Sequence, residues 1–155
     1  MNINLKHINW VLKTFETLTP FELYDILKLR SEVFVVEQNC VFLDADSKDQ
    51  FSYHLLGFIE NNLVAYTRLI AAGKAYNYAS IGRVVTSAKY RKLGIGKELM
   101  EVSIKKCYEL FGETPIKIGA QLYLKNFYEL LGFTQSSQVY DEDGIDHIEM
   151  IKPAP

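Results

Sequence analysis

Several shortages in this sequence each exclude a class of protein. Its 155 residues include only two cysteines, Cys40 and Cys107, with no C-x-x-C motif and no neighbouring histidine pair. We therefore expect two reduced, buried thiols rather than a disulfide framework or a zinc site, and no bound metal. Four prolines and nine glycines are too few for a disordered chain. No apolar run approaches the ~18 residues of a membrane span, and residues 1–13 lack the layout of a signal peptide, so we expect a cytoplasmic protein that does not contact a membrane.

A surplus of positive charge is also missing. The 17 lysines and arginines are outnumbered by 19 aspartates and glutamates, which gives a net charge of −2. This balance removes the attraction that drives non-specific nucleic-acid binding, so we expect no nucleic-acid partner. The chain is 48% hydrophobic and 23% charged, and its length is that of one ordinary domain. We therefore predict one compact domain over residues 1–155.

The first predicted element is a helix that begins after Thr19. The threonine can accept a hydrogen bond from a free amide, Pro20 is tolerated in the first turn, and Glu22 completes a capping box. Apolar residues at helical spacing carry the helix to about Glu37. A polar loop follows.

The remainder alternates between strands and helices. Strands are predicted at 53–60 and 63–72, around an Asn61-Asn62 turn, and at 76–86. The apolar period then becomes helical up to Gly112. The last predicted elements are a strand at 116–120, a helix at 122–131 closed by Gly132, and two strands around Asp143-Gly144. This order predicts a mixed α/β fold with one layered sheet.

The segment 89–97, between a strand and the long helix, carries the strongest chemical signal. Four of its nine residues are basic, and Gly94 and Gly96 stand where the helix begins. Free amides at a helix N-terminus, its positive dipole end and closely approaching glycine backbone suit a pyrophosphate. The alternative is an uncapped helix start with incidental lysines, because a lone G-x-G is a weak signal. P-loop and dinucleotide-binding glycine motifs are absent, so another phosphate geometry is expected.

Two spaced motifs resemble those of the GNAT acetyltransferases. The string Val84-Val85-Thr86, followed by residues 91–96, is similar to their acetyl-CoA signature R/Q-x-x-G-x-G/A. Residues 121–133 resemble their second signature, N-x-x-A-x-x-x-Y-x-x-x-G-F. The likeness extends to the ElaA-like branch of the family through the segments 22–24, 27–30, 33–38, 81–85, 119–121 and 142–148.

This resemblance implies a fold, a cosubstrate and a set of site residues. The implied fold is a mixed, mostly antiparallel sheet of about seven strands, flanked by about four helices and splayed between two parallel strands that admit the pantetheine of acetyl-CoA. Tyr128 would face the sulfur. The residues implied to bind acetyl-CoA are Val84, Val85, Thr86, Arg91, Lys92, Leu93, Gly94, Ile95, Gly96, Lys97 and Gln121.

The chain departs from the family pattern at two positions. Gln121 stands where many members have asparagine, and its extra methylene shifts the expected contact with pantetheine. Ile116 stands where some members that acetylate protein N-termini carry a catalytic glutamate, so that base is not carried over. A main-chain amide at Val84 or Val85, released where the strand bulges, is the expected oxyanion donor.

Several side chains have a structural interpretation beside the catalytic one. Tyr128 is either a core aromatic or a donor to the leaving thiolate. Glu37 is a general base, an anchor for a cationic substrate, or a helix-end carboxylate with a local hydrogen bond. His54 and His147 lie in apolar strands, where a structural histidine is commoner than a base.

The acidic residues of the loops have two interpretations. Asp44, Asp46 and Asp49 resemble half of a calcium loop but lack its glycine and terminal glutamate, so a metal is not expected. Together with the carboxylates at 141–146, they either attract a cationic amine or are merely solvated.

The predicted function is N-acetylation. We expect an enzyme that moves acetyl from acetyl-CoA to a primary amine by direct attack in a ternary complex. The acceptor is either an amine-bearing small molecule or a protein amine, and the protein is either a monomer or a homodimer. The alternative function is a non-catalytic acyl-CoA sensor or interaction module.

Overall fold

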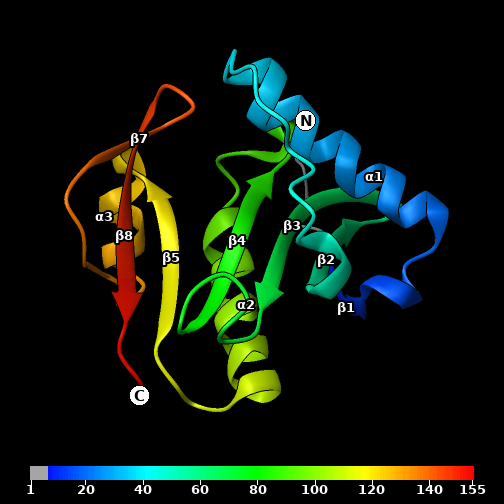
Figure 1. The fold of residues 1–155 in the computed structure, drawn as a ribbon. Helices are drawn as coiled ribbons and strands as arrows, with labels where there is room; N and C mark the ends of the chain where they lie inside the picture. The colour runs from blue at the N-terminus through cyan, green and yellow to red at the C-terminus, as the bar shows by residue number, and fades with distance from the viewer. Residues whose placement is uncertain (1–6) are drawn as a thin grey trace.

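A computed structural model describes residues 7–155, and its main feature is one open, eight-stranded sheet (Figure 1). The strand order is β1-β2-β3-β4-β5-β8-β6, with β7 paired to β8. Residues 1–6, part of the segment in which no signal peptide is expected, lie outside the described residues. The strands are β1 (Asn9–Thr14), β2 (Tyr53–Ile59), β3 (Asn62–Ile70), β4 (Ala79–Thr86), β5 (Ile116–Gln121), β6 (Thr134–Gln135), β7 (Tyr140–Glu142) and β8 (Ile145–Lys152).

The junction between β4 and β5 divides the sheet into two parts. These strands are parallel, whereas every other pair is antiparallel. Their register consists of only two pairs, Ala79 with Ile116 and Ser80 with Lys117. Beyond these pairs the strands diverge toward their carboxyl ends, as Figure 1 shows. The splay implied by the family resemblance is therefore confirmed, in a sheet with one strand more than the implied seven.

Three α-helices and one π-helical segment flank the sheet. They are α1 (Pro20–Arg30), its π-helical continuation (Ser31–Glu37), α2 (Ile95–Phe111) and α3 (Lys125–Glu129). The predicted capping box is present at the start of α1, where the Glu22 amide donates to Thr19 Oγ1 at 3.1 Å and the Thr19 amide donates to Glu22 Oε1 at 2.8 Å. The predicted end at Glu37 is also confirmed, although the last seven residues are π-helical.

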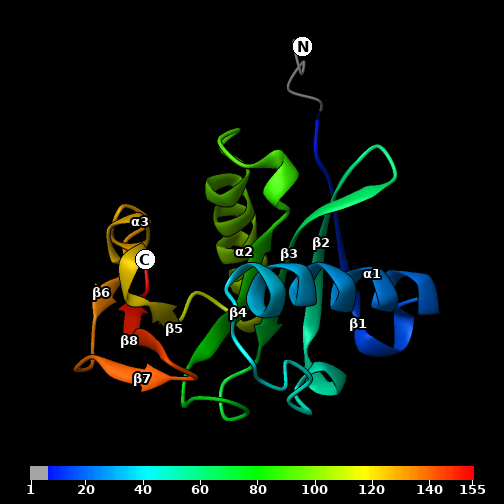
Figure 2. The same ribbon diagram turned by 90° about the horizontal axis from the view of Figure 1, so that it is seen from above.

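The helices lie on opposite faces of the sheet (Figure 2). One apolar cluster joins Ile26 and Leu29 of α1 to Leu56, Tyr66 and Val85 of the sheet. On the other face, α2 and α3 cover strands β3, β4, β5 and β8 with a larger core. One face of the split between β4 and β5 therefore lies on the side of α1, and the other lies on the side of α2 and α3.

Some elements differ from the sequence prediction. Strands β1 and β6 were not predicted, and the hairpin turn lies one residue earlier than expected, because Asn62 already belongs to β3. Glu60 takes the left-handed conformation in that turn, with a φ of 56°. Within residues 7–155, no helix is both long and apolar enough to cross a bilayer.

Candidate functional site

The loop before α2 combines two left-handed residues with an open helix N-terminus. Lys92 has a φ of 66°, and Gly94, the N-cap, has a φ of 76°. No side chain of the described residues caps the helix, and its first backbone bond runs from the Glu98 amide to the Gly94 carbonyl at 3.2 Å. The amides of residues 95–97 precede that bond and therefore have no acceptor within the helix. Together with the positive end of the α2 dipole, they form an anion-binding geometry.

Gly96, in the first turn of α2, has room for a side chain among the residues that the structure describes. A Cβ built there would meet only the Phe127 Cζ, at 3.9 Å, which is ordinary van der Waals contact. Its φ is not in the left-handed region. Because glycine in a helix costs about 0.5–1 kcal/mol relative to alanine, the protein accepts a cost here that its own packing does not require. A ligand that approaches the backbone closely provides such a reason, and pyrophosphate fits the open amides.

Strand β4 bulges where it leaves β5. Tyr66 of β3 pairs with Val85 and Arg68 pairs with Gly82, so Thr67 alone faces two β4 residues, Arg83 and Val84. Arg83 has a φ of 49°, which is left-handed. A bulge leaves a main-chain amide outside the ladder, and this one lies at the split.

Two carboxylates hold the bulged residue in place. The Arg83 Nη2 donates to the Asp44 carbonyl oxygen at 3.0 Å and to Asp46 Oδ2 at 3.3 Å, while its Nε lies 2.9 Å from Asp44 Oδ1. The Phe42 ring packs over the guanidinium, with 5.9 Å from Cζ to the ring centroid. A strained φ costs of order 1–3 kcal/mol, and these contacts offset it.

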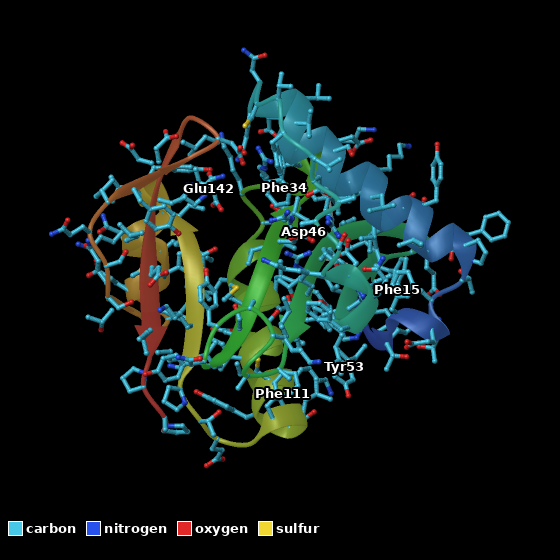
Figure 3. The ribbon with its side chains drawn as sticks, in the orientation of Figure 1. Phe15, Phe34, Asp46, Tyr53, Phe111 and Glu142 are labelled. Carbon is cyan, nitrogen blue, oxygen red and sulfur yellow. The ribbon has the colours of Figure 1, made fainter. Side chains whose placement is uncertain are left out.

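The same loop neutralises two further buried arginines. Arg30 Nε donates to Asp44 Oδ2 at 2.8 Å, and its Nη1 donates to Asp49 Oδ1 at 2.8 Å. Arg68 Nη1 donates to Asp46 Oδ1 at 2.8 Å; Figure 3 places Asp46 between α1 and β4. Burial alone would raise the pKa of Asp46, but the hydrogen bonds and charges of the arginines hold it well below its usual range. Asp44, Asp46 and Asp49 are therefore committed to arginines, and for these three residues both sequence interpretations are wrong. The carboxylates at 141, 142, 143 and 146 are exposed, so the two interpretations stay open for them.

His54 is structural. It is completely buried, and its ring nitrogens lie 2.7 Å from the Tyr66 hydroxyl and 2.9 Å from the Asp49 carbonyl oxygen. Burial lowers its pKa. Both nitrogens are occupied within the core under α1, so His54 does not act as a base at the split.

The end of the π-helical segment spans the split. Both guanidinium Nη atoms of Arg91 donate to the Glu37 carboxylate, one of them at 2.7 Å, on the β4 side. On the β5 side, Gln38 and Gln121 exchange side-chain hydrogen bonds at 3.2 Å in each direction. The hydrogen bond from Arg91 is the main cause that lowers the pKa of Glu37, outweighing its slight desolvation.

Tyr128, in α3, lies on the α2 face of the split. It is buried, with its ring edge-to-face against Phe127 at 5.1 Å and Phe133 at 6.0 Å between centroids. Within the described residues its hydroxyl makes no hydrogen bond, and the hydroxyl is not fully occluded. Burial raises its pKa, so the phenol stays protonated at neutral pH and can only donate to a developing anion.

The other residues predicted for the site lie at the ends of β4 and β5, beside the split. Val84, Val85 and Thr86 end β4, while Gln121 ends β5. Both cysteines are free and buried, as predicted. His147 pairs in register with Gln121; its Nδ1 donates to the Ile145 carbonyl oxygen at 2.7 Å, and its Nε2 lies 3.2 Å from Glu142 Oε2.

Sequence reasoning missed four residues of this region. They are Gln38, Arg83, Tyr76 and Tyr140. Gln38 and Arg83 lie in segments that carry the family likeness but had no assigned role, and the two tyrosines lie outside those segments. The two tyrosines come from the β3–β4 loop and from β7, and only the fold brings them together. The alternation of Tyr140 with Glu142 before the Asp143-Gly144 turn is a local signal that would have placed Tyr140 on the same face as an acidic side chain.

Comparisons with known proteins agree with this geometry. A family model described as an acetyltransferase (GNAT) domain matches residues 34–154. The chain is 40% identical over 149 residues to a UPF0039 protein of Synechocystis sp., covering 96% of this chain and 97% of that one. It is 38% identical over 147 residues to the protein ElaA of Escherichia coli, covering 94% and 96%.

Solved structures give the same answer. The crystal structure of Escherichia coli ElaA matches with a TM-score of 0.88 at 37% identity, covering 94% of this chain and 99% of that one. A structure described as an acyl-CoA N-acyltransferase from Pseudomonas aeruginosa matches with a TM-score of 0.90 at 38% identity, also covering 94% and 99%. The split sheet, the open amides at α2 and these matches lead to one conclusion: the chain belongs to the GNAT acetyltransferase family, in its ElaA-like branch.

Proposed function

We propose that this protein is an acetyl-CoA-dependent N-acetyltransferase that acts on a primary amine by direct attack in a ternary complex. The observation that carries the proposal is the combination of the split between β4 and β5 with the open amides of α2 at its mouth. A coenzyme whose phosphates bind those amides can extend its arm into the split. The amides alone would account only for phosphate binding, and the split alone only for the arm.

In this proposal the coenzyme is held mainly by backbone. The amides of residues 95–97 and the side chains of Arg91, Lys92 and Lys97 bind the pyrophosphate, because charge-assisted bonds to phosphate are the stronger class. Val84, Val85 and Thr86 offer backbone groups to the pantetheine, and Gln121 faces them across the split. Acetyl-CoA supplies an activated acyl group as a thioester.

The reaction follows from the groups on either face of the split. The acceptor nitrogen attacks the thioester carbonyl carbon, and the oxygen takes up negative charge near the bulge at Arg83 and Val84, where a free amide can stabilise it. The carbon–sulfur bond then breaks, and the thiolate leaves with the electron pair and takes up, through water, the second proton that the nitrogen loses on becoming an amide. Tyr128 donates a hydrogen bond to this thiolate without transferring the proton fully. The thiolate, whose conjugate thiol has a pKa near 8.5, is a weaker base than phenolate.

The acceptor must also lose a proton. A lysine-like amine of pKa about 10.4 costs roughly 4–5 kcal/mol to deprotonate at pH 7, whereas an α-amine near 7.7–8.0 costs about 1–1.4 kcal/mol. We assign the uptake of this proton, through water, to Glu37. Arg91, the present partner of Glu37, can bind the coenzyme phosphates instead. Glu37 would then lose this hydrogen bond, and its pKa would return toward its ordinary value.

Calorimetry and a thiol-release assay test the proposal. Acetyl-CoA should bind the wild-type protein, and free thiol should appear when amines are added. Tyr128→Phe should lower turnover at least tenfold while coenzyme affinity stays within twofold, because the phenol touches only the leaving sulfur. Tight binding without turnover on any amine would favour an acyl-CoA sensor instead. No heat on adding acetyl-CoA would refute the proposed function.

A further inference from the structure

The hydroxyls of Tyr76 and Tyr140 meet at β5 beside the split, and the proposed mechanism gives them no role. A Cβ built at Gly119 would lie 3.1 Å from the Tyr76 hydroxyl and 3.4 Å from the Tyr140 hydroxyl. Both hydroxyls therefore rest on the bare backbone of Gly119. Within residues 7–155 neither makes a hydrogen bond, and neither is fully occluded, so both keep unused hydrogen-bonding capacity toward a ligand.

The tyrosine pair lies on the face opposite Tyr128. Ile118 and Ala120 point into the core under α2 and α3, so Gly119, between them, faces the other way. Gln121 lies on the same face as Gly119, two residues further along β5, and therefore about 6.6 Å nearer the mouth of the split. A ligand at the tyrosine pair is thus about two residues of β5 from Gln121, which the pantetheine is proposed to contact, and a short carbon chain covers that distance.

The electrostatic field at the pair favours a cation. Glu149 is the register partner of Gly119, and Glu142 lies on the face of β7 that carries Tyr140. Burial, then Glu149 and Glu142, raise the pKa of Tyr76, while burial, Tyr76 and both carboxylates raise that of Tyr140 to about 12. Figure 3 shows Glu142 on the side of β7 nearest the segment that carries Phe34.

One ammonium group already occupies part of this surface. Lys117 Nζ lies 2.8 Å from Glu149 Oε2 and 5.1 Å from the centroid of the Tyr76 ring. Among the described residues, Glu142 has His147 as its ion-pair partner, and its side chain is 58% exposed, so it retains capacity for a second cation. The surface therefore carries two carboxylates against one lysine.

The two sides of the split carry opposite charge. Segment 89–97, on the β4 side, has four basic residues and no acidic one, whereas segment 140–147, on the β5 side, has four acidic residues and no lysine or arginine. The Cys40 thiol donates to the Asp143 carbonyl oxygen at 3.2 Å, which holds this hairpin against the segment that spans the split. The basic side suits phosphates, so the acidic side is left for the acceptor.

We propose that Tyr76, Tyr140, Glu142 and Glu149 bind one ammonium group of the acceptor, and that the acceptor is a small diamine whose second amino group reaches the thioester. This inference rests on the proposed function and narrows its acceptor to one chemical class. A single amine would have nothing to place at the tyrosine pair, whereas a diamine fills both positions.

The test compares 1,4-diaminobutane with 1-aminobutane as acceptors in the thiol-release assay. The wild-type protein should prefer the diamine by at least tenfold in kcat/KM, since hydrogen bonds to a charged group are worth about one factor of ten or more. Glu142→Gln and Tyr140→Phe should each reduce that preference by about tenfold. The matched control is Asp146→Asn, which removes the same charge from the same hairpin on the opposite face of β7 and β8 and should keep the preference.

Each other outcome contradicts a separate claim. Equal use of the two amines, or a preference that survives both substitutions, would overturn the diamine site while the acetyltransferase stands. A preference lost equally in Asp146→Asn would mean general attraction by the hairpin, which also overturns the site. If acetyl-CoA binds but neither amine is acetylated, the acceptor class is wrong. If acetyl-CoA does not bind, the proposed function itself fails.

Discussion

Gly96→Ala should change stability and coenzyme affinity in opposite directions. The new methyl group meets only Phe127 Cζ at 3.9 Å, so it enters without a clash. Replacing a helical glycine should therefore stabilise the fold by about 0.5–1 kcal/mol, which raises Tm by about 1–4 °C for a chain of this size. The same methyl group stands over the amides that hold the pyrophosphate. Loss of one charge-assisted hydrogen bond, worth about 1.5–3 kcal/mol, should weaken acetyl-CoA binding by about 10- to 150-fold.

Gly112→Ala, at the other end of α2, is the matched control. Its φ of 90° is left-handed, so alanine should destabilise the fold by about 1–2 kcal/mol while coenzyme affinity is unchanged. Thermal unfolding measures the stability of both variants, and calorimetry measures their affinity for acetyl-CoA. The reasoning is refuted if Gly96→Ala binds acetyl-CoA as tightly as wild type, because Gly96 would then have no role at the phosphates.

Two further predictions concern charged groups. Glu37→Gln frees Arg91 for the phosphates, so calorimetry should show tighter acetyl-CoA binding while kcat falls. An exposed ion pair is worth at most about 1 kcal/mol, which limits the gain in affinity to about fivefold. Weaker binding would contradict this prediction. His54 and Asp46 have folded-state pKa values below their unfolded ones, so each contributes stability that is lost as pH falls. The unfolding free energy should therefore decrease below about pH 6.5, and again below about pH 4, and Asp46→Asn should remove part of the second decrease. Urea unfolding at about pH 7, 5.5, 4 and 3 measures both decreases; equal stability at pH 7 and 5.5 would contradict the first.

Local signals in the sequence predicted much of the fold. The capping box at Thr19 and Glu22 fixed the start of α1, and Gly112 marked the end of α2. The Asp143-Gly144 turn, where both residues have positive φ, placed the β7–β8 hairpin. Each of these features is decided by hydrogen bonds and backbone conformation within a few residues, so the sequence alone contains the information.

Features that depend on distant partners were not predictable in the same way. Strand β1 exists because it pairs with β2, 39 to 49 residues away. The charges of Asp44, Asp46 and Asp49 suggested solvent or substrate, because their arginine partners come from α1, β3 and β4. In such cases the residue type is visible in the sequence, but its partner is set by the topology of the sheet.

The segment that spans the split connects these two kinds of information. Arg91 and Gln121 come from the two motifs that resemble the family, and in the structure they are bound by the adjacent residues Glu37 and Gln38. If both motif residues contact acetyl-CoA as proposed, its binding must exchange these internal bonds for bonds to the coenzyme. The exposed ion pair is worth no more than about 1 kcal/mol and a neutral hydrogen bond about the same, so the exchange costs little. Because β4 and β5 share only two register pairs, the exchange would take place where the two parts of the sheet are joined mainly by the apolar core under α2 and α3.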